Sequence, residues 1–189
     1  MSKPTSVILL CEDKRTAVFV RSYLKERGVS HGIRIHSNPS GSGFDWVLDQ
    51  YPIEVNAYRQ NKGRLKIWLI VVIDADNKSV GARLNQLDTK LGQAENARLL
   101  DLRIEDESIA RLVPRRNIET WILVLTGTPA NEEENYKNTR NKEEWHELAI
   151  QGGKELHRWT RPNSRISESC TDSLHRGIQE LRRVEDPTR

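Results

Sequence analysis

The stretch of sequence that decides the fold is KIWLIVVIDADN, residues 66–77. Its first eight residues form the most hydrophobic run in the chain, and the run ends abruptly at Asp74-Ala75-Asp76. A continuous apolar run of this length, rich in β-branched residues, is typical of a strand buried on both faces of a parallel sheet. We therefore expect a central strand with two aspartates directly after its carboxyl end.

Toward the N-terminus, the run SVILLC at residues 6–11 has the same character and is followed at once by Glu12. Residues 13–28 then carry apolar side chains on one stripe at helical spacing, which predicts a strand, a tight turn and a helix. The alternating residues 33–36 predict another short strand, and a helix is expected from Phe44.

Toward the C-terminus, residues 79–91 repeat apolar side chains at 3.6-residue spacing and predict an amphipathic helix. Residues 109–113 predict a fourth strand. Asn117 is placed to cap a helix that Gly127 ends. Strands thus alternate with helices, so the predicted class is α/β, with a mainly parallel four-stranded sheet flanked by helices.

The character of the chain changes after residue 128. Residues 129–144 are polar and lack an apolar stripe, which predicts a linker or insertion that leads into a short helix near Trp145. A terminal helix is expected around Leu174, Ile178 and Leu181. The predicted organisation is a catalytic core at residues 1–128 and a small helical C-terminal appendage within residues 129–189.

The composition indicates a globular protein. The chain has 189 residues, a hydrophobic fraction of 36%, a mean hydropathy of −0.69 and a net charge of +3, which by itself does not argue for a nucleic-acid partner. The two cysteines, Cys11 and Cys170, have no spacing typical of a zinc site or a disulfide framework. The first apolar run is too short for a signal peptide or a membrane span, so we expect a cytoplasmic protein without a membrane partner.

Acidic residues follow two of the predicted strands. The carboxyl ends of neighbouring parallel strands meet at one edge of a sheet, so Glu12, Asp74 and Asp76 are expected to converge there. Oxygen ligands without histidine or cysteine favour Mg²⁺ or Mn²⁺. The alternative is that these acids cap helices, and because Asp13 and Asn77 already suit that role, we favour a metal site.

VILLCEDK and LIVVIDADN, with a glutamate after the first strand and D-x-D after a later one, resemble the Toprim domain. The resemblance covers about residues 6–125. It implies a Mg²⁺-dependent catalytic core of the kind shared by topoisomerases, primases, nucleases of the OLD (overcoming lysogenisation defect) type and a ribonuclease that matures ribosomal RNA. In these enzymes the glutamate performs acid–base work and the aspartates bind metal, roles that would pass to Glu12, Asp74 and Asp76.

Further residues are weaker candidates. OLD-type nucleases use additional acids for a second metal, and Glu119 in PRRNIETW resembles such an acid; the alternative is an exposed helix face with solvated arginines. Trp145 and Trp159 lie near several arginines, a mixture that either stacks bases or pins the appendage to the core. The residues expected to contact nucleic acid are Lys14, Arg115, Arg116, Arg158, Arg161 and Arg165.

The favoured function is a Mg²⁺-dependent nuclease acting on DNA or RNA, because the chain lacks room for the tyrosine domain of a topoisomerase or the template module of a primase. Small Toprim-like nucleases resemble the effector subunits of prokaryotic anti-phage defence systems. Such a role requires a separate ABC- or SMC-like ATPase, since the chain has no Walker motif. The alternative is a non-catalytic binding or assembly module. A phosphatase is disfavoured, because its D-x-D would follow the first strand.

Overall fold

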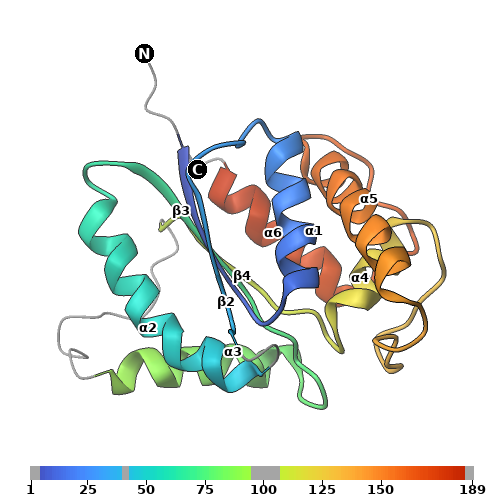
Figure 1. Cartoon of the computed structure of the whole chain (residues 1–189), viewed down its shortest axis with the longest axis horizontal. Coiled ribbons are helices and arrows are strands. Elements are labelled where there is room, and N and C mark those ends of the chain that lie inside the picture. The colour runs from blue at the N-terminus through green and yellow to red at the C-terminus, as the bar shows by residue number, and fades with distance from the viewer. Residues whose placement is uncertain (1–4, 40–42, 95–106, 186–189) are drawn as a thin grey trace.

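A computed structural model describes residues 5–39, 43–94 and 107–185 (Figure 1). The described part is an α/β fold with one four-stranded parallel sheet flanked by six helices. The strands are β1 (Thr5–Cys11), β2 (Ile33–Ser37), β3 (Lys66–Val72) and β4 (Ile109–Leu112). The helices are α1 (Lys14–Glu26), α2 (Phe44–Asn61), α3 (Val80–Gln93), α4 (Ile118–Leu125), α5 (Lys142–Thr160) and α6 (Asp172–Glu185).

The strand order is β2-β1-β3-β4, with every pair parallel. β3 is central: it pairs with β1 on one side, where Cys11 lies opposite Val72, and with β4 on the other. Every residue of β3 after Lys66 is buried. The predicted fold class, the central strand and the adjacency of the first and central strands are therefore confirmed.

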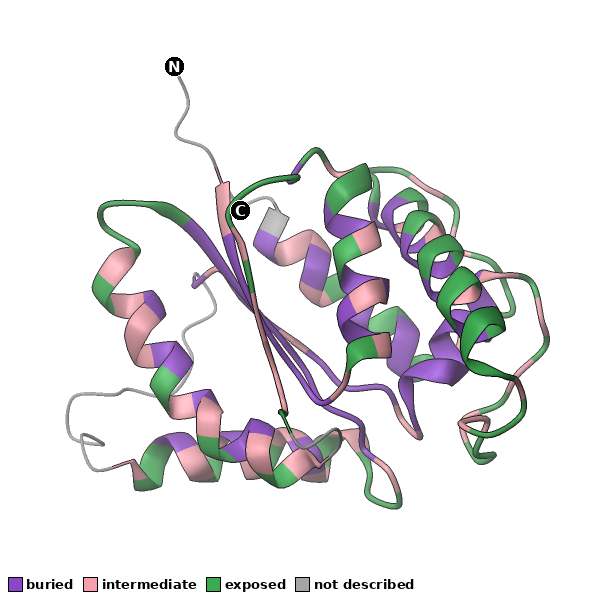
Figure 2. Cartoon of the chain, in the orientation of Figure 1, coloured by how far each residue is buried: buried purple, intermediate pink, exposed green. Residues whose placement is uncertain are grey.

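Helices cover both faces of the sheet (Figures 1 and 2). Leu9 and Ile70 belong to a hydrophobic cluster with α1, α4, α5 and α6, whereas Leu10 and Val71 belong to a second cluster with α2 and α3. Successive residues of a strand point to opposite faces. Because both faces are covered, nearly every strand residue must be apolar, and this is the physical origin of the continuous apolar runs in the sequence.

The local signals at the helix ends are mostly confirmed. The Asp13 carboxylate caps α1 by accepting a hydrogen bond of 2.8 Å from the Thr16 backbone amide. Ser79 caps α3 in the same way, so the capping role considered for Asn77 is wrong. Asn117 does precede α4, but its side chain makes no capping hydrogen bond. Its amide instead donates to Asn135 Oδ1 at 3.0 Å, so Asn117 ties α4 to the polar segment after residue 128.

The prediction of a short helix near Trp145 is wrong in length, because α5 spans 19 residues. Asn141 caps the start of the helix, and its side chain forms a reciprocal capping box with Glu144. The first turn of α5 contains only polar residues before Trp145, so the apolar pattern in the sequence did not indicate where the helix starts. Two buried glycines, Gly152 and Gly153, let the helix axis approach α1 closely, since a Cβ at residue 153 would lie 2.3 Å from the Phe19 carbonyl oxygen.

The two sequence regions meet in one hydrophobic core. Trp145 and Leu156 of α5 and Ile178 of α6 belong to the same buried cluster as Phe19 and Trp121. Helices α5 and α6 therefore pack on the same face of the sheet as α1 and α4. In the described part of the chain, none of the helices has the length and apolar character needed to cross a membrane.

Candidate functional site

The candidate site lies where β1 and β3 end. Glu12 follows β1 directly, and Asp74 comes two residues after the end of β3. The backbone amide of Asp74 donates a hydrogen bond of 2.7 Å to Glu12 Oε1, and both side chains are buried. The neighbouring strands thus bring the first two predicted acids together at the carboxyl edge of the sheet, which is where open α/β sheets place their reactive crevice.

Asp76 reaches the same place by an unexpected backbone path. Residues two apart face the same way in an extended segment, but Asp76 has φ of 52°, so the backbone is left-handed there. Aspartate tolerates this conformation better than most residues. The amides of Ala75 and Asp76 donate to the carbonyl oxygens of Pro114 and Arg116 at 2.8 and 3.2 Å, so the segment after β4 holds the turn.

Arg83 of α3 holds the backbone of the Asp74–Asp76 turn, and it was not identified as a site residue from the sequence. Its side chain is 1% exposed, and its Nε donates to the Asp74 carbonyl oxygen at 2.8 Å. A terminal nitrogen lies 3.4 Å from both the Ala75 carbonyl oxygen and Asp76 Oδ2, while the guanidinium stacks 4.0 Å from the Phe44 ring. In the sequence Arg83 looks like any polar member of an amphipathic helix, so no local signal identified it.

Glu119 joins the site from the first turn of α4. It is 1% exposed, which excludes the exposed helix face considered from the sequence. Arg15 of α1 forms an ion pair with Glu119 Oε1 and also lies over the Trp145 ring, 5.0 Å from its centroid. Glu119 Oε2 is buried and has no hydrogen-bond partner among the described residues. An orphaned buried carboxylate oxygen is costly and requires an explanation.

Lys137 is the unpredicted cation of the site. Its Nζ lies 3.4 Å from Asp74 Oδ2 and 3.7 Å from Asp76 Oδ1. Burial lowers the pKa of Lys137, but the charges of Asp74, Asp76, Glu119 and Glu12 outweigh it, so the pKa is raised. Lys137 belongs to the polar segment that the sequence predicted as a linker, where nothing distinguishes it from other surface lysines.

The segment that carries Lys137 is tied to the core. Asn135 Oδ1 accepts hydrogen bonds of 3.0 Å from the Lys137 backbone amide and from the Asn117 side chain. Glu132 Oε1 accepts a hydrogen bond of 3.0 Å from the Ser173 amide at the start of α6. These hydrogen bonds fix the position of residues 132–137 relative to the core, so that Lys137 lies beside the carboxylates of Asp74 and Asp76.

The acidic side chains are held in environments that disfavour their charge. Burial, together with the negative charges of Asp76 and Asp13, raises the pKa of Glu12 to about 7, although the hydrogen bond from the Asp74 amide and the charge of Lys137 act against it. Burial and the charges of Glu12 and Glu119 raise the pKa of Asp74 well above its ordinary value. Burial also raises the pKa of Glu119 despite Arg15. Perturbed carboxylates of this kind concentrate at functional sites.

We expect Glu12→Gln to remove a pH dependence of stability. Below about pH 4.5 Glu12 is protonated in both the folded and the unfolded chain, but between about pH 4.5 and 7 the unfolded chain ionises first, so wild type loses stability as the pH rises. The metal-free variant should therefore become more stable than wild type by up to about 3 kcal/mol at pH 7 and above. Urea unfolding in EDTA at pH 4 and pH 7.5 measures this; equal differences at both pH values would contradict it.

The types of side chain at the site suit a divalent cation, but in the described part of the chain their positions do not form a complete set of metal ligands. Carboxylate oxygens are the ligands that Mg²⁺ and Mn²⁺ prefer, and Glu119 Oε2 is an oxygen without a partner. Over residues 5–39, 43–94 and 107–185, however, no three His, Cys, Asp or Glu side chains are gathered as ligands of one ion. The positive charges of Lys137, Arg15 and Arg83 contact the carboxylates instead.

Three of the basic residues predicted to contact nucleic acid lie near this edge. Lys14 is the exposed first residue of α1. Arg116 donates to the Asn77 side chain and lies 3.4 Å from the Asp76 carbonyl oxygen. Arg115 donates to the Lys78 carbonyl oxygen, and its amide donates to Ser173. Both arginines therefore brace the turns around the acids, and both remain partly exposed.

The other three predicted basic residues do not join the site. Arg158 and Arg161 lie at the C-terminal end of α5, whereas Trp145 at its N-terminal end contacts Arg15. Arg158 lies thirteen positions after Trp145 along the helix, which corresponds to about 20 Å. Arg165 follows in the exposed segment after the helix. These arginines thus belong to the opposite end of the molecule from the carboxylates.

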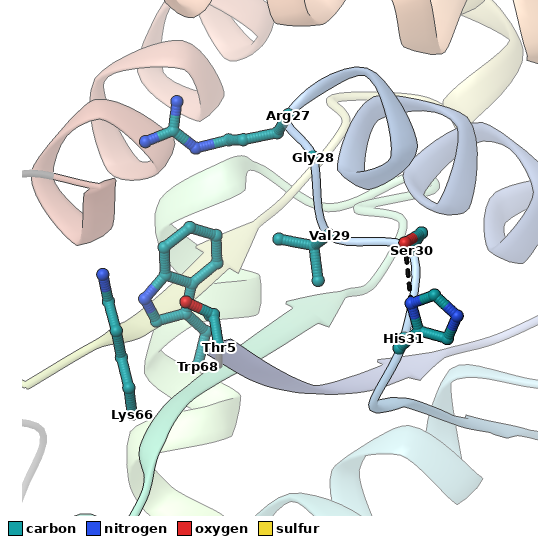
Figure 3. A pocket seen from close by; sticks show the side chains of 8 residues that line it. All are labelled: Thr5, Arg27, Gly28, Val29, Ser30, His31, Lys66 and Trp68. Carbon is teal, nitrogen blue, oxygen red and sulfur yellow. Dashed lines mark hydrogen bonds between the residues drawn. The ribbon is translucent and has the colours of Figure 1, made fainter. Parts of the chain in front are cut away.

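A cavity of about 390 Å³ also lies at that opposite end (Figure 3). Thr5, Lys66 and Trp68 line it from the amino ends of β1 and β3, and residues 27–31 close it, with Arg27 lying 5.6 Å from the Trp68 ring. It contains none of the candidate acids. The cavity and the carboxylate site are therefore separate features of the fold.

Comparisons with protein-family models, with curated proteins and with solved structures find no match to this chain.

Proposed function

We propose that the chain is a metal-dependent phosphodiesterase that acts on nucleic acid, a Toprim-type nuclease as the sequence motifs imply. The observation that carries the proposal is the burial of Glu12, Asp74 and Glu119 at one sheet edge, with Glu119 Oε2 left without a partner. Buried carboxylates destabilise a fold unless cations, hydrogen-bond donors or protonation offset their charge, and Lys137 and Arg15 leave Glu119 Oε2 without a partner among the described residues. A site that retains them despite this cost is more readily explained by function than by stability.

A bound Mg²⁺ or Mn²⁺ would supply the positive charge that a phosphodiester needs during cleavage and would lower the pKa of a water nucleophile. Asp74, Asp76 and Glu119 are the side chains that would hold it. Glu12 accepts the hydrogen bond from the Asp74 amide directly beside these side chains, and the resemblance assigns proton transfer to it. Lys14, Arg115 and Arg116 lie beside this edge and offer positive charge to the backbone of DNA or RNA.

The resemblance extends the proposal to a biological setting, in which the chain is the effector of a prokaryotic anti-phage defence system. In such a system the chain would work with an ABC- or SMC-like ATPase, which would hydrolyse ATP. Association of the purified chain with such an ATPase, measured by size-exclusion chromatography, tests this extension separately from cleavage.

One observation favours the alternative, a non-catalytic binding or assembly module. The Lys137 ammonium already lies between Asp74 and Asp76, so a salt bridge neutralises part of the acidic charge without a metal. A structural cluster of this kind would not respond to divalent cations. Metal dependence therefore separates the two functions.

We expect the purified chain to cleave nucleic acid only when a divalent cation is present. Plasmid DNA, linear DNA and total RNA are incubated with Mg²⁺, Mn²⁺ or EDTA, with and without a candidate ATPase subunit, and the products are resolved on gels. Cleavage in Mn²⁺ that disappears in EDTA supports the nuclease. Intact substrates under every condition, together with a melting temperature that Mn²⁺ does not change, would favour the assembly module.

A further inference from the structure

The positive charges around the cluster are held in different ways. Arg83 is buried and donates to two backbone carbonyl oxygens, and Arg15 is shared between Glu119 and the Trp145 ring. If either guanidinium moved away from the carboxylates, its other contacts would be lost: the hydrogen bonds of Arg83 to backbone carbonyl oxygens, or the contact of Arg15 with the Trp145 ring. The Lys137 ammonium, within the described part of the chain, contacts only the carboxylates of Asp74 and Asp76. It is thus the cation that leaves the cluster with the least loss of other contacts.

Lys137 also has a route out of the cluster. Its side chain is 38% exposed, so the lysine lies partly open to solvent at the edge of the cluster. Its backbone amide is held by Asn135, and Asn135 in turn is held by Asn117. Rotation of the lysine side chain would therefore remove the ammonium from both aspartates while the polar segment keeps its path.

We infer that Lys137 is the resident counter-ion of the acidic cluster and that a divalent cation binds by displacing it from Asp74 and Asp76. The inference rests on the proposed function, because it assumes that these acids hold a metal. A metal bound to these carboxylates would compete for their oxygens with the Lys137 ammonium, which lies 3.4 Å from Asp74 Oδ2 and 3.7 Å from Asp76 Oδ1. Like charges so close repel in a partly buried site, so one cation excludes the other.

The competition makes a prediction that does not depend on cleavage. Removing the ammonium should leave the acids without a counter-ion and tighten metal binding, by about tenfold for the loss of one strong competing contact. Lys137→Ala and Lys137→Met both remove the charge, and the second retains the side-chain bulk. Lys137→Arg retains the charge and should bind metal no more tightly than wild type.

Lys78 provides the matched control. It is exposed and lies two residues after Asp76, so Lys78→Ala changes the net charge equally near the same turn. In the described structure its ammonium forms no ion pair with the cluster. We expect Lys78→Ala to bind metal within about twofold of wild type, because solvent screens an exposed charge.

The measurement is titration of each metal-free protein with Mn²⁺, in which the electron paramagnetic resonance signal reports the free ion. Tenfold tighter binding in Lys137→Ala or Lys137→Met, lost again when Asp74→Asn is added, supports the inference. If the Lys137 variants match Lys78→Ala, or bind Mn²⁺ more weakly than wild type, the inference is wrong while the metal site stands. If neither wild type nor any variant binds up to about 10 mM Mn²⁺, the inference and the proposed function both fail.

Discussion

Asp74→Asn is expected to lower the rate of nucleic-acid cleavage at least about a hundredfold, because it removes a charged ligand from the proposed metal site. The fold should remain intact, since asparagine has nearly the same shape as aspartate. Without metal the variant should even be more stable than wild type near pH 7: burial raises the pKa of Asp74, so its ionised form destabilises the folded state. Cleavage assays in Mn²⁺ and thermal melts in EDTA measure the two effects.

Asp49→Asn is the matched control for this variant. Asp49 lies on α2, is 61% exposed and pairs with Lys90 on the surface, so its replacement removes the same charge far from the cluster. We expect its cleavage rate and melting temperature to stay close to those of wild type. If Asp74→Asn cleaves as fast as Asp49→Asn, Asp74 has no part in catalysis and the assembly module becomes the better explanation.

Gly153→Ala should destabilise the fold by about 3 kcal/mol or more, which corresponds to a fall of about 10 °C in the melting temperature. The new Cβ would lie 2.3 Å from the Phe19 carbonyl oxygen and 2.9 Å from the Tyr23 backbone nitrogen. Both atoms belong to the α1 backbone, so no side-chain rotation relieves the clash. The two helices must separate, and the apolar contacts between them weaken. Urea unfolding monitored by circular dichroism measures the loss.

Gly152→Ala tests whether the effect belongs to this contact or to the loss of a glycine. Its Cβ would lie 3.4 Å from the nearest atom, on the Phe19 ring, which is ordinary van der Waals contact. Alanine favours helix over glycine by up to about 1 kcal/mol, so this neighbour should be as stable as wild type or more stable. Equal destabilisation by both variants would show that α5 does not lie against α1 as described.

The elements of the sheet could be predicted because their cause is local in the sequence. Residues 66–73 and 6–11 must be apolar when helices cover both faces, and this leaves continuous apolar runs. Capping is local as well, so Asp13 and Gly127 marked helix ends at the right places. The short helix predicted near Trp145 failed for the opposite reason, because the packing of α5 on α1 is a contact between distant segments.

The sequence by itself determined the α/β class, the parallel sheet and the meeting of Glu12 with the D-x-D acids, because side-chain periodicity and strand ends are properties of neighbouring residues. Only the tertiary structure decided which cations stand beside them. Arg15 meets Glu119 across 104 positions of sequence, and Lys137 arrives on a polar segment without periodicity. Polar contacts between distant segments leave no repeating pattern in the chain. The charge balance of the candidate site therefore becomes visible only after folding brings these segments together.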